Sequence, residues 1–408
     1  MTEVTFTKER RRGTGRATHA GLTVLAALIL GGLSAGAAGA TDLELGKWVD
    51  KAKVSGDFRL RYDGIHYGVQ NAGNVDRNQE RFRLRVGLDL PVQNDVTVRT
   101  RFASGTGEQT STNQSFDNLG SQKAFWIDRA YLEWKPMGGM FTLTGGRMAN
   151  PLWNQYSSDI VWDDDYNPEG FGQKVDLLAG PVALFANAMQ NVVDEDKTTN
   201  KDQWEFSEQV GAEFHMPWET RLRLAYAQHD WIHISTGTKF TVPADGTLGA
   251  VPPTKVQDGN RRNAAGVLLN DFHVHEVSAN YSLWAFQVPV SLQLTYIVNT
   301  GVSDVYSSKQ NKGYQWGTIL GKAAAKNSVE LAYFYKYSQS DATVADVADS
   351  DFGEGGTNRK GHIGWIAYNF QEWAQLKFKF FQTKTLEPSL TPGPKDINRF
   401  QTDLVYKF

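Results

Sequence analysis

Apolar and polar residues alternate along many short stretches of the chain. In the last stretch, INRFQTDLVYKF, Phe400, Leu404 and Phe408 share one parity, whereas Arg399 and Asp403 share the other. A two-residue period places one set of side chains on each face of a β-strand. The pattern therefore predicts strands that are apolar on one face and polar on the other.

The alternation recurs in stretches about as long as a tilted membrane-spanning strand. One of them, 122–135, breaks the pattern, because Asp128 shares the parity of Trp126 and Leu132, and we expect a β-bulge there. The prediction is sixteen strands, at 54–63, 80–91, 95–104, 122–135, 140–147, 170–179, 182–190, 205–216, 220–230, 271–285, 288–299, 313–324, 327–338, 360–370, 373–384 and 397–408.

The connections alternate between tight turns such as PVQND and KPMGG and longer polar segments. Short turns at one end and long loops at the other are the plan of bacterial outer-membrane barrels, with both chain ends on the periplasmic side. Such a barrel must close, because every backbone polar group in hydrocarbon needs a partner, and sixteen strands enclose a water-filled interior. The long loops are expected near 64–79, 105–121, 148–169, 191–204, 231–270, 300–312, 339–359 and 385–396.

The alternation alone leaves a large soluble β-protein as the alternative. A soluble strand would rarely end on an aromatic residue, because chain ends usually fray. The last strand, with Tyr406 and the terminal Phe408, resembles the assembly signal of bacterial outer-membrane proteins. We therefore favour an all-β transmembrane antiparallel barrel.

The first forty residues differ in character from the rest. Basic residues precede an apolar run from Ala20 to Ala40, and Ala38 and Ala40 fit the A-x-A cleavage pattern. We interpret 1–40 as a cleaved secretory signal peptide rather than a membrane-anchoring helix. The expected division is then a short periplasmic segment at 41–53 and a transmembrane barrel at 54–408.

Composition narrows the function. Residues 1–40 carry five basic and two acidic residues, so cleavage would move the formal net charge from −3 to about −6. A mildly acidic chain argues against nucleic acid as a partner. The absence of cysteine excludes disulfides and cysteine-based metal sites or nucleophiles. Outside the expected signal peptide, where GLSAG (32–36) fits the first pattern, no G-x-S-x-G or H-E-x-x-H motif occurs, so we expect no enzyme.

Six stretches resemble the putative-porin family of Gram-negative outer membranes, most strongly over 54–180. They are SGDFRLRYD (55–63), ERFRLRVGLDL (80–90), TSTNQSF (110–116), IDRAYLEWKP (127–136), GGRMANPLW (145–153) and WDDDYNPEG (162–170). The resemblance implies a sixteen-stranded homotrimeric diffusion channel for small solutes. Its expected partners are outer-membrane lipid, lipopolysaccharide and the barrel-assembly machinery.

The acidic stretch WDDDYNPEG falls in the third long loop, which folds into the barrel in sixteen-stranded porins. The resemblance thus implies an acidic channel constriction at Asp163, Asp164, Asp165 and Glu169. The polar parity of the strands supplies a basic channel lining: Arg59, Arg61, Arg81, Arg83, Arg85, Arg99, Arg101, Arg221 and Arg223. Opposite charges across a narrow water-filled gap create a transverse field that selects solutes by size, polarity and charge.

Several alternatives remain for these residues. The arginines could pair locally with Asp57, Asp63, Glu80 and Asp89. The acidic loop could instead be exposed outside the barrel, or Asp163 and Asp165 could bind Ca²⁺, which would be the only cofactor, although their spacing matches no EF-hand loop. If the loop folds inward, Gly145 and Gly146 would permit the turn, and Trp153 and Trp162 could pack it onto the wall or instead be membrane-interface anchors.

Four histidines near one rim suggest a metal site that the parity argues against. His229 shares the parity of the lumen-facing arginines, whereas His273 shares the opposite parity, and His233 and His275 complete the set. Pairs that point in opposite directions cannot share a metal ion.

The prediction for the whole chain is a passive porin. The alternatives are a substrate-selective channel with a basic track for phosphate or other anions, and a structural or adhesive outer-membrane barrel that acts through long loops such as 231–270.

Overall fold

The computed structural model describes residues 51–69, 75–92, 94–195, 201–234, 259–263, 266–303, 309–390 and 396–408. The expected signal peptide at 1–40, nearly all of the segment at 41–53 and most of the loop 231–270 lie outside the described residues. Among the residues that are described, no helix is long and apolar enough to cross a membrane.

One antiparallel sheet contains all the strands of the described chain, sixteen long ones and the two-residue β4. They are β1 (Lys53–Tyr67), β2 (Arg77–Pro91), β3 (Val96–Ser104), β4 (Gln114–Ser115), β5 (Phe125–Trp134), β6 (Phe141–Arg147), β7 (Glu169–Ala179), β8 (Val182–Asp194), β9 (Gln203–His215), β10 (Arg221–Ile232), β11 (Phe272–Ala285), β12 (Val288–Asn299), β13 (Lys312–Gly321), β14 (Ser328–Ser338), β15 (Arg359–Gln371), β16 (Ala374–Thr385) and β17 (Ile397–Lys407). Short 3₁₀ turns occur at η2 (Asn118–Gly120), η3 (Met137–Gly139), η4 (Ala345–Val347) and η5 (Pro388–Leu390).

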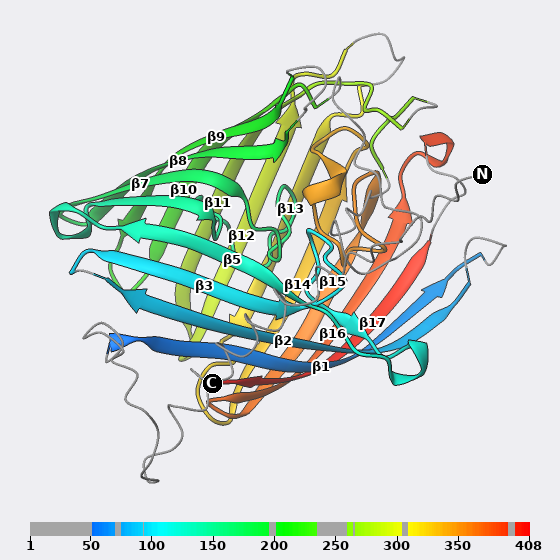
Figure 1. Cartoon of the computed structure of the whole chain (residues 1–408), viewed down its shortest axis with the longest axis horizontal. Helices are drawn as coiled ribbons and strands as arrows, with labels where there is room; N and C mark the ends of the chain where they lie inside the picture. Colours follow the sequence, from blue (N-terminus) through cyan, green and yellow to red (C-terminus); the bar gives the residue numbers. More distant parts are fainter. Residues whose placement is uncertain are drawn as a thin grey trace, which may run out of the picture. The chain divides into compact units, whose positions relative to one another are not determined.

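The sheet closes into a barrel because β1 pairs with β17 as well as with β2 (Figure 1). The seam runs from Asp57 opposite Lys407 to Tyr67 opposite Ile397. Beyond β17, Phe408 exchanges two backbone hydrogen bonds with Gly56, of 2.8 and 3.1 Å. A Cβ at Gly56 would lie only 2.5 Å from the Phe408 ring, so only glycine leaves room for the terminal aromatic. The sixteen-stranded closed barrel is thus confirmed.

Side chains alternate across the barrel wall as the sequence predicts. On β10, Ala227 and His229 are buried inside, whereas Leu224 and Tyr226 are exposed on the outside. The predicted bulge also occurs: Arg101 pairs with Arg129, but Phe102 pairs with Ile127, so Asp128 is the extra residue. The bulge shifts the parity and lets Asp128 face inward against Arg101.

Two long loops contribute to the core inside the barrel. Residues 148–168 lie between β6 and β7, and residues 339–358 lie between β14 and β15. Trp162 of the first and Val344 of the second belong to one buried apolar cluster with Trp231, Phe272 and other inward-facing strand residues. An inward position was predicted for the first loop only, whereas 339–359 was expected to be an ordinary external loop.

Candidate channel constriction

Loop 148–168 crosses the barrel interior and is bonded to the far wall. It leaves β6 after Gly146, whose φ of +124° favours glycine and whose added Cβ would lie 2.4 Å from the Ala130 carbonyl oxygen. The Trp153 amide donates to Gln209 of β9, and the Gln155 amide group donates to the Leu294 carbonyl of β12.

Further along the loop, the bonds continue to the next strands. The Ser157 carbonyl accepts a hydrogen bond of 2.9 Å from Gln315 of β13, and the Tyr156 hydroxyl donates to Glu330 of β14 at 3.3 Å. Together with the contacts to β9 and β12, these bonds reach four strands on the wall opposite the arginines of β1–β3.

Aromatic contacts fix the same loop. Trp162 stacks on Tyr166 at 5.4 Å and contacts the rings of His229 and Trp231 on β10 at 5.7 and 5.6 Å. Trp153 lies 4.5 Å from the Arg223 guanidinium, which also covers Phe185 on β8. The expectation that both tryptophans pack the loop onto the wall is confirmed.

Loop 339–358 forms the other half of the internal structure, and its backbone is bonded directly to the first loop. The Asp163 amide donates to the Val347 carbonyl at 2.8 Å, and the Asp349 amide donates to the Asp159 carbonyl at 3.2 Å. Ser350 donates its amide to the Asp163 carboxylate at 2.8 Å. The sequence did contain a signal for this loop, since Ala342, Val344 and other apolar residues interrupt an otherwise polar segment.

Asp165 is the aspartate that reaches the basic wall. Its Oδ1 lies 3.2 Å from Nη1 of Arg85. Burial raises the pKa of Asp165, but the guanidinium groups of Arg83, Arg85 and Arg59 outweigh burial and lower the pKa below its usual value. This carboxylate therefore stays charged and neutralises part of the wall.

The two neighbouring aspartates lie in other environments. Asp163 is buried and does not protrude; its oxygens accept the amides of Asp165 and Ser350, both at 2.8 Å. Burial, with the charges of Asp165 and Asp349, raises its pKa. Asp164 is exposed within the lumen. The surrounding protein still desolvates the carboxylate, and this effect and the charge of Asp165 raise the pKa of Asp164. The charge of Lys379 acts in the opposite direction.

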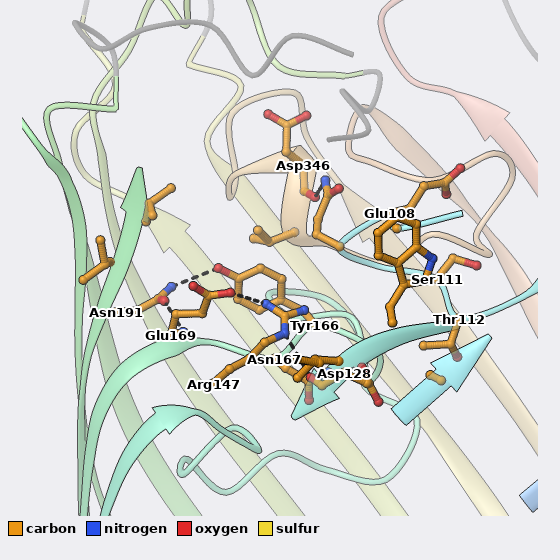
Figure 2. A pocket seen from close by; sticks show the side chains of 18 of the residues that line it. Glu108, Ser111, Thr112, Asp128, Arg147, Tyr166, Asn167, Glu169, Asn191 and Asp346 are labelled. Atoms are coloured by element: carbon orange, nitrogen blue, oxygen red, sulfur yellow. Dashed lines mark hydrogen bonds and ion pairs between the residues drawn. The ribbon is translucent and has the colours of Figure 1, made fainter. Parts of the chain in front are cut away.

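Glu169 lies apart from the other three acids. It begins β7 and pairs with Arg147 of β6 at 2.6 Å. Both line a chamber of about 600 Å³ at the long-loop end, together with Tyr166 and Asn191, which are joined by a 2.9 Å hydrogen bond (Figure 2).

A second chamber, of about 1240 Å³, lies at the short-turn end. It is lined by residues of the tight turns, including Thr220 and Lys322, and by Trp153 and Tyr156. Because the end of loop 148–168 lines the first chamber and its middle lines the second, the loop separates the two.

Most of the predicted wall arginines are paired with carboxylates. Some of these partners are the nearby acids that the local-pairing alternative named. Arg83 and Arg85 both bond Asp57 at 2.7 Å, and Arg81 lies 3.6 Å from Asp63. The remaining pairs are Arg99 with Asp89 and Glu133, Arg101 with Asp128, Arg61 with Asp403, and Arg221 and Arg223 with Glu213. Arg59 donates to Asn113 and lies 3.8 Å from Asp403.

Sequence reasoning missed several charged residues of the lumen. Asp351, in loop 339–358, lies 3.2 Å from Arg61 and 3.0 Å from Arg399, and Arg399 also bonds Asp63 at 2.7 Å. Burial raises the pKa of Asp351, yet the charges of Arg399 and Arg61 lower it well below the usual range. Each inward loop thus places one carboxylate against the basic wall, Asp165 and Asp351.

The histidines do not form a metal site. His229 is buried and contacts Ser207 at 2.6 Å and Glu276 at 3.3 Å, whereas His273 is half-buried and pairs with Asp230 at 2.9 Å. Within the described ranges, no group of three or more His, Asp or Glu side chains is arranged to hold a metal ion. Asp163 and Asp165, considered for Ca²⁺, use their carboxylates on backbone amides and on Arg85 instead.

Comparisons with known proteins agree with this architecture. A family profile described as Putative porin matches residues 69–408. Among curated protein sequences, no match is found.

Among solved structures, OprB of Pseudomonas putida at high pH is 10% identical, with a TM-score of 0.55 over 89% of this chain and 96% of that chain. The outer-membrane channel DcaP of Acinetobacter baumannii is 14% identical, with a TM-score of 0.46 over 88% and 97%. A variant of the Rhodopseudomonas blastica porin is 11% identical, with a TM-score of 0.47 over 88% and 100%. At this identity the OprB match shows the fold alone. The two matches with lower TM-scores support no conclusion about this chain.

A closed sixteen-stranded antiparallel barrel defines the class of bacterial outer-membrane channels. The family match covers most of the chain, and the chain belongs to the Putative porin family. It is an outer-membrane, porin-like channel and not an enzyme.

Proposed function

We propose that this porin passes small hydrophilic solutes and ions by passive diffusion, through a constriction formed by loops 148–168 and 339–358. The observation that carries the proposal is the set of hydrogen bonds from loop 148–168 to β9, β12, β13 and β14. A loop bonded to the wall opposite its own strands narrows any path along the barrel axis.

Fewer unpaired loop carboxylates lie at this constriction than the sequence predicts. Asp165 and Asp351 are paired with wall arginines, which reduces the field of both partners. Among the described residues of loop 148–168, Asp164 is exposed and has no ion pair, so its charge reaches a passing ion. We propose that Asp164 gives the constriction its acidic side, and that the basic wall gives the other side of a transverse field.

Planar-bilayer recording tests the channel proposal directly. Detergent-purified, folded protein should produce stepwise increases in conductance, whereas the same preparation unfolded by boiling should produce none. If the folded protein produced no steps, the channel proposal would fail, and a structural or adhesive barrel would become the better account.

The assembly that we propose is a homotrimer. The outer face of the barrel is broadly apolar, with exposed residues such as Leu292 and Leu331. This surface suits both lipid and neighbouring copies of the chain. Chemical cross-linking in mild detergent should give a ladder that ends at three subunits; a ladder that ended at one would contradict the trimer.

A further inference from the structure

Two lysines on β16 face the lumen beside an aromatic cluster. Lys377 and Lys379 share the parity of the fully buried Phe381, whereas Phe378 between them is exposed on the outer face. Lys377 Nζ lies 4.5 Å from the centroid of the Trp365 ring. Lys379 Nζ lies 5.8 Å from the same centroid and 4.6 Å from that of Phe381.

The aromatic platform under these lysines is fixed from several sides. Trp365 is 4% exposed and stacks on Phe334 with a centroid distance of 5.5 Å. Its Nε1 donates to Glu330 Oε1 at 2.8 Å, and Tyr156 of loop 148–168 meets it edge-on at 6.2 Å. Cation–π attraction therefore holds both ammonium groups in place without neutralising their positive charge.

These two cations lack the carboxylate partner that several other cations of the lumen have. Lys336 is bonded to Asp349 at 2.6 Å and Arg399 to Asp63 at 2.7 Å, but within the described residues neither Lys377 nor Lys379 has a carboxylate oxygen within 4.0 Å. Three of the surrounding carboxylates are engaged elsewhere: Glu330 accepts from Trp365 and Tyr156, Asp403 from Arg61, and Asp351 from Arg61 and Arg399. Asp164, whose charge interacts with that of Lys379, lies beyond ion-pair distance of its ammonium group.

We propose that Lys377 and Lys379 form a lumenal binding site for short dicarboxylate dianions. The site rests on the proposed channel function, because its ligand must reach it through the lumen. The two side chains leave the strand roughly 6.6 Å apart, and their ammonium groups rest over different rings, Lys377 over Trp365 and Lys379 nearer to Phe381. Two separately held ammonium groups suit a ligand with two separate carboxylates better than one compact phosphate. Binding must be weak enough for the solute to leave, as conduction requires.

Inhibition of the salt current by added succinate tests the site. In wild-type channels, millimolar succinate should reduce the potassium chloride current and should do so at a lower concentration than phosphate or acetate. In Lys377→Gln/Lys379→Gln channels, succinate should inhibit about tenfold more weakly, because two ammonium charges are lost. The matched control is Lys384→Gln, since Lys384 is an exposed lysine on the outer parity of the same strand.

Each outcome of this experiment decides something different. Equal succinate inhibition in the double variant and the wild type would overturn the site, as would a wild-type current insensitive to succinate. Equal potency of succinate and phosphate would overturn the assignment to dicarboxylates. A folded wild type that carried no current would contradict the channel function itself and the site with it. The Trp365→Leu variant keeps both charges and should weaken inhibition by less than the double variant.

Discussion

Asp163, Asp164 and Asp165 are consecutive in sequence but differ in environment. Asp165 pairs with Arg85, whereas Asp163 accepts the Asp165 amide of its own loop and the Ser350 amide of loop 339–358. Asp164 alone is exposed within the lumen. In this acidic stretch, Asp165 therefore attaches the loop to the barrel wall, Asp163 attaches it to loop 339–358, and Asp164 is accessible to solutes.

The pH dependence of ion selectivity follows from these environments. Burial and neighbouring carboxylates raise the pKa of Asp159, Asp163 and Asp164. An acid with a raised pKa loses its negative charge earlier as pH falls, whereas Asp165 and Asp351, with lowered pKa values, stay charged. We therefore expect the reversal potential in a salt gradient to move toward anions between neutral and mildly acidic pH.

The same titration in Asp164→Asn channels provides the control. The shift should be smaller there, because the exposed carboxylate is already neutral. A wild-type reversal potential that stayed constant over this range would contradict the assignment of raised pKa values to the loop.

The sequence predicted which way the charged residues face, but not their partners. Alternation alone placed the arginines of β1–β3 in the lumen, and the parity break at Asp128 located the bulge. The pairs themselves come from closure: Arg61 bonds Asp403, 342 residues away, because β1 meets β17. Lys377 and Lys379 lie on the polar parity of β16, yet only their position over Trp365 distinguishes them from other lumenal lysines.

At the scale of elements, two loops rather than one fill the interior. Loop 339–358 has the polar and glycine-rich composition of an external loop, so composition predicted solvent exposure. Its apolar residues, including Val344 and Phe352, are nevertheless buried in the two interior clusters. The apolar residues of the loop are a signal for burial, but the surfaces that cover them come from strands far apart in sequence, and a single sequence does not reveal those surfaces.

A disulfide can test the position of loop 148–168. Ser158 Oγ lies 3.2 Å from Thr295 Oγ1 on β12, and the natural chain has no cysteine to interfere. The Ser158→Cys/Thr295→Cys variant should form an internal disulfide on mild oxidation, because the side chains are already adjacent. The readout is the loss of free thiols by mass spectrometry.

Each single cysteine variant serves as the control and should keep its thiol. Channels carrying the disulfide should conduct as the wild type does, since the bond fixes the loop where it already lies. Thiols that remained free in the folded double variant would show that the loop lies elsewhere.

At the scale of the whole molecule, the barrel follows from a simple constraint. Strands with one apolar face must leave no unpaired backbone edge in hydrocarbon, and the seam between β1 and β17 removes the edge. This constraint is local and periodic, so the fold and strand number could be predicted from sequence. The interior is aperiodic, so periodicity could not predict its two chambers or the loop that separates them.

The central claim is that loop 148–168 sets the ion selectivity of the lumen through Asp164. The most direct measurement compares reversal potentials in a potassium chloride gradient for wild-type, Asp164→Asn and Asp117→Asn channels. Asp117 is the control, because it is an exposed loop aspartate already paired with Lys123. The account predicts a shift toward anions for Asp164→Asn and none for Asp117→Asn. Identical reversal potentials in all three channels would contradict it.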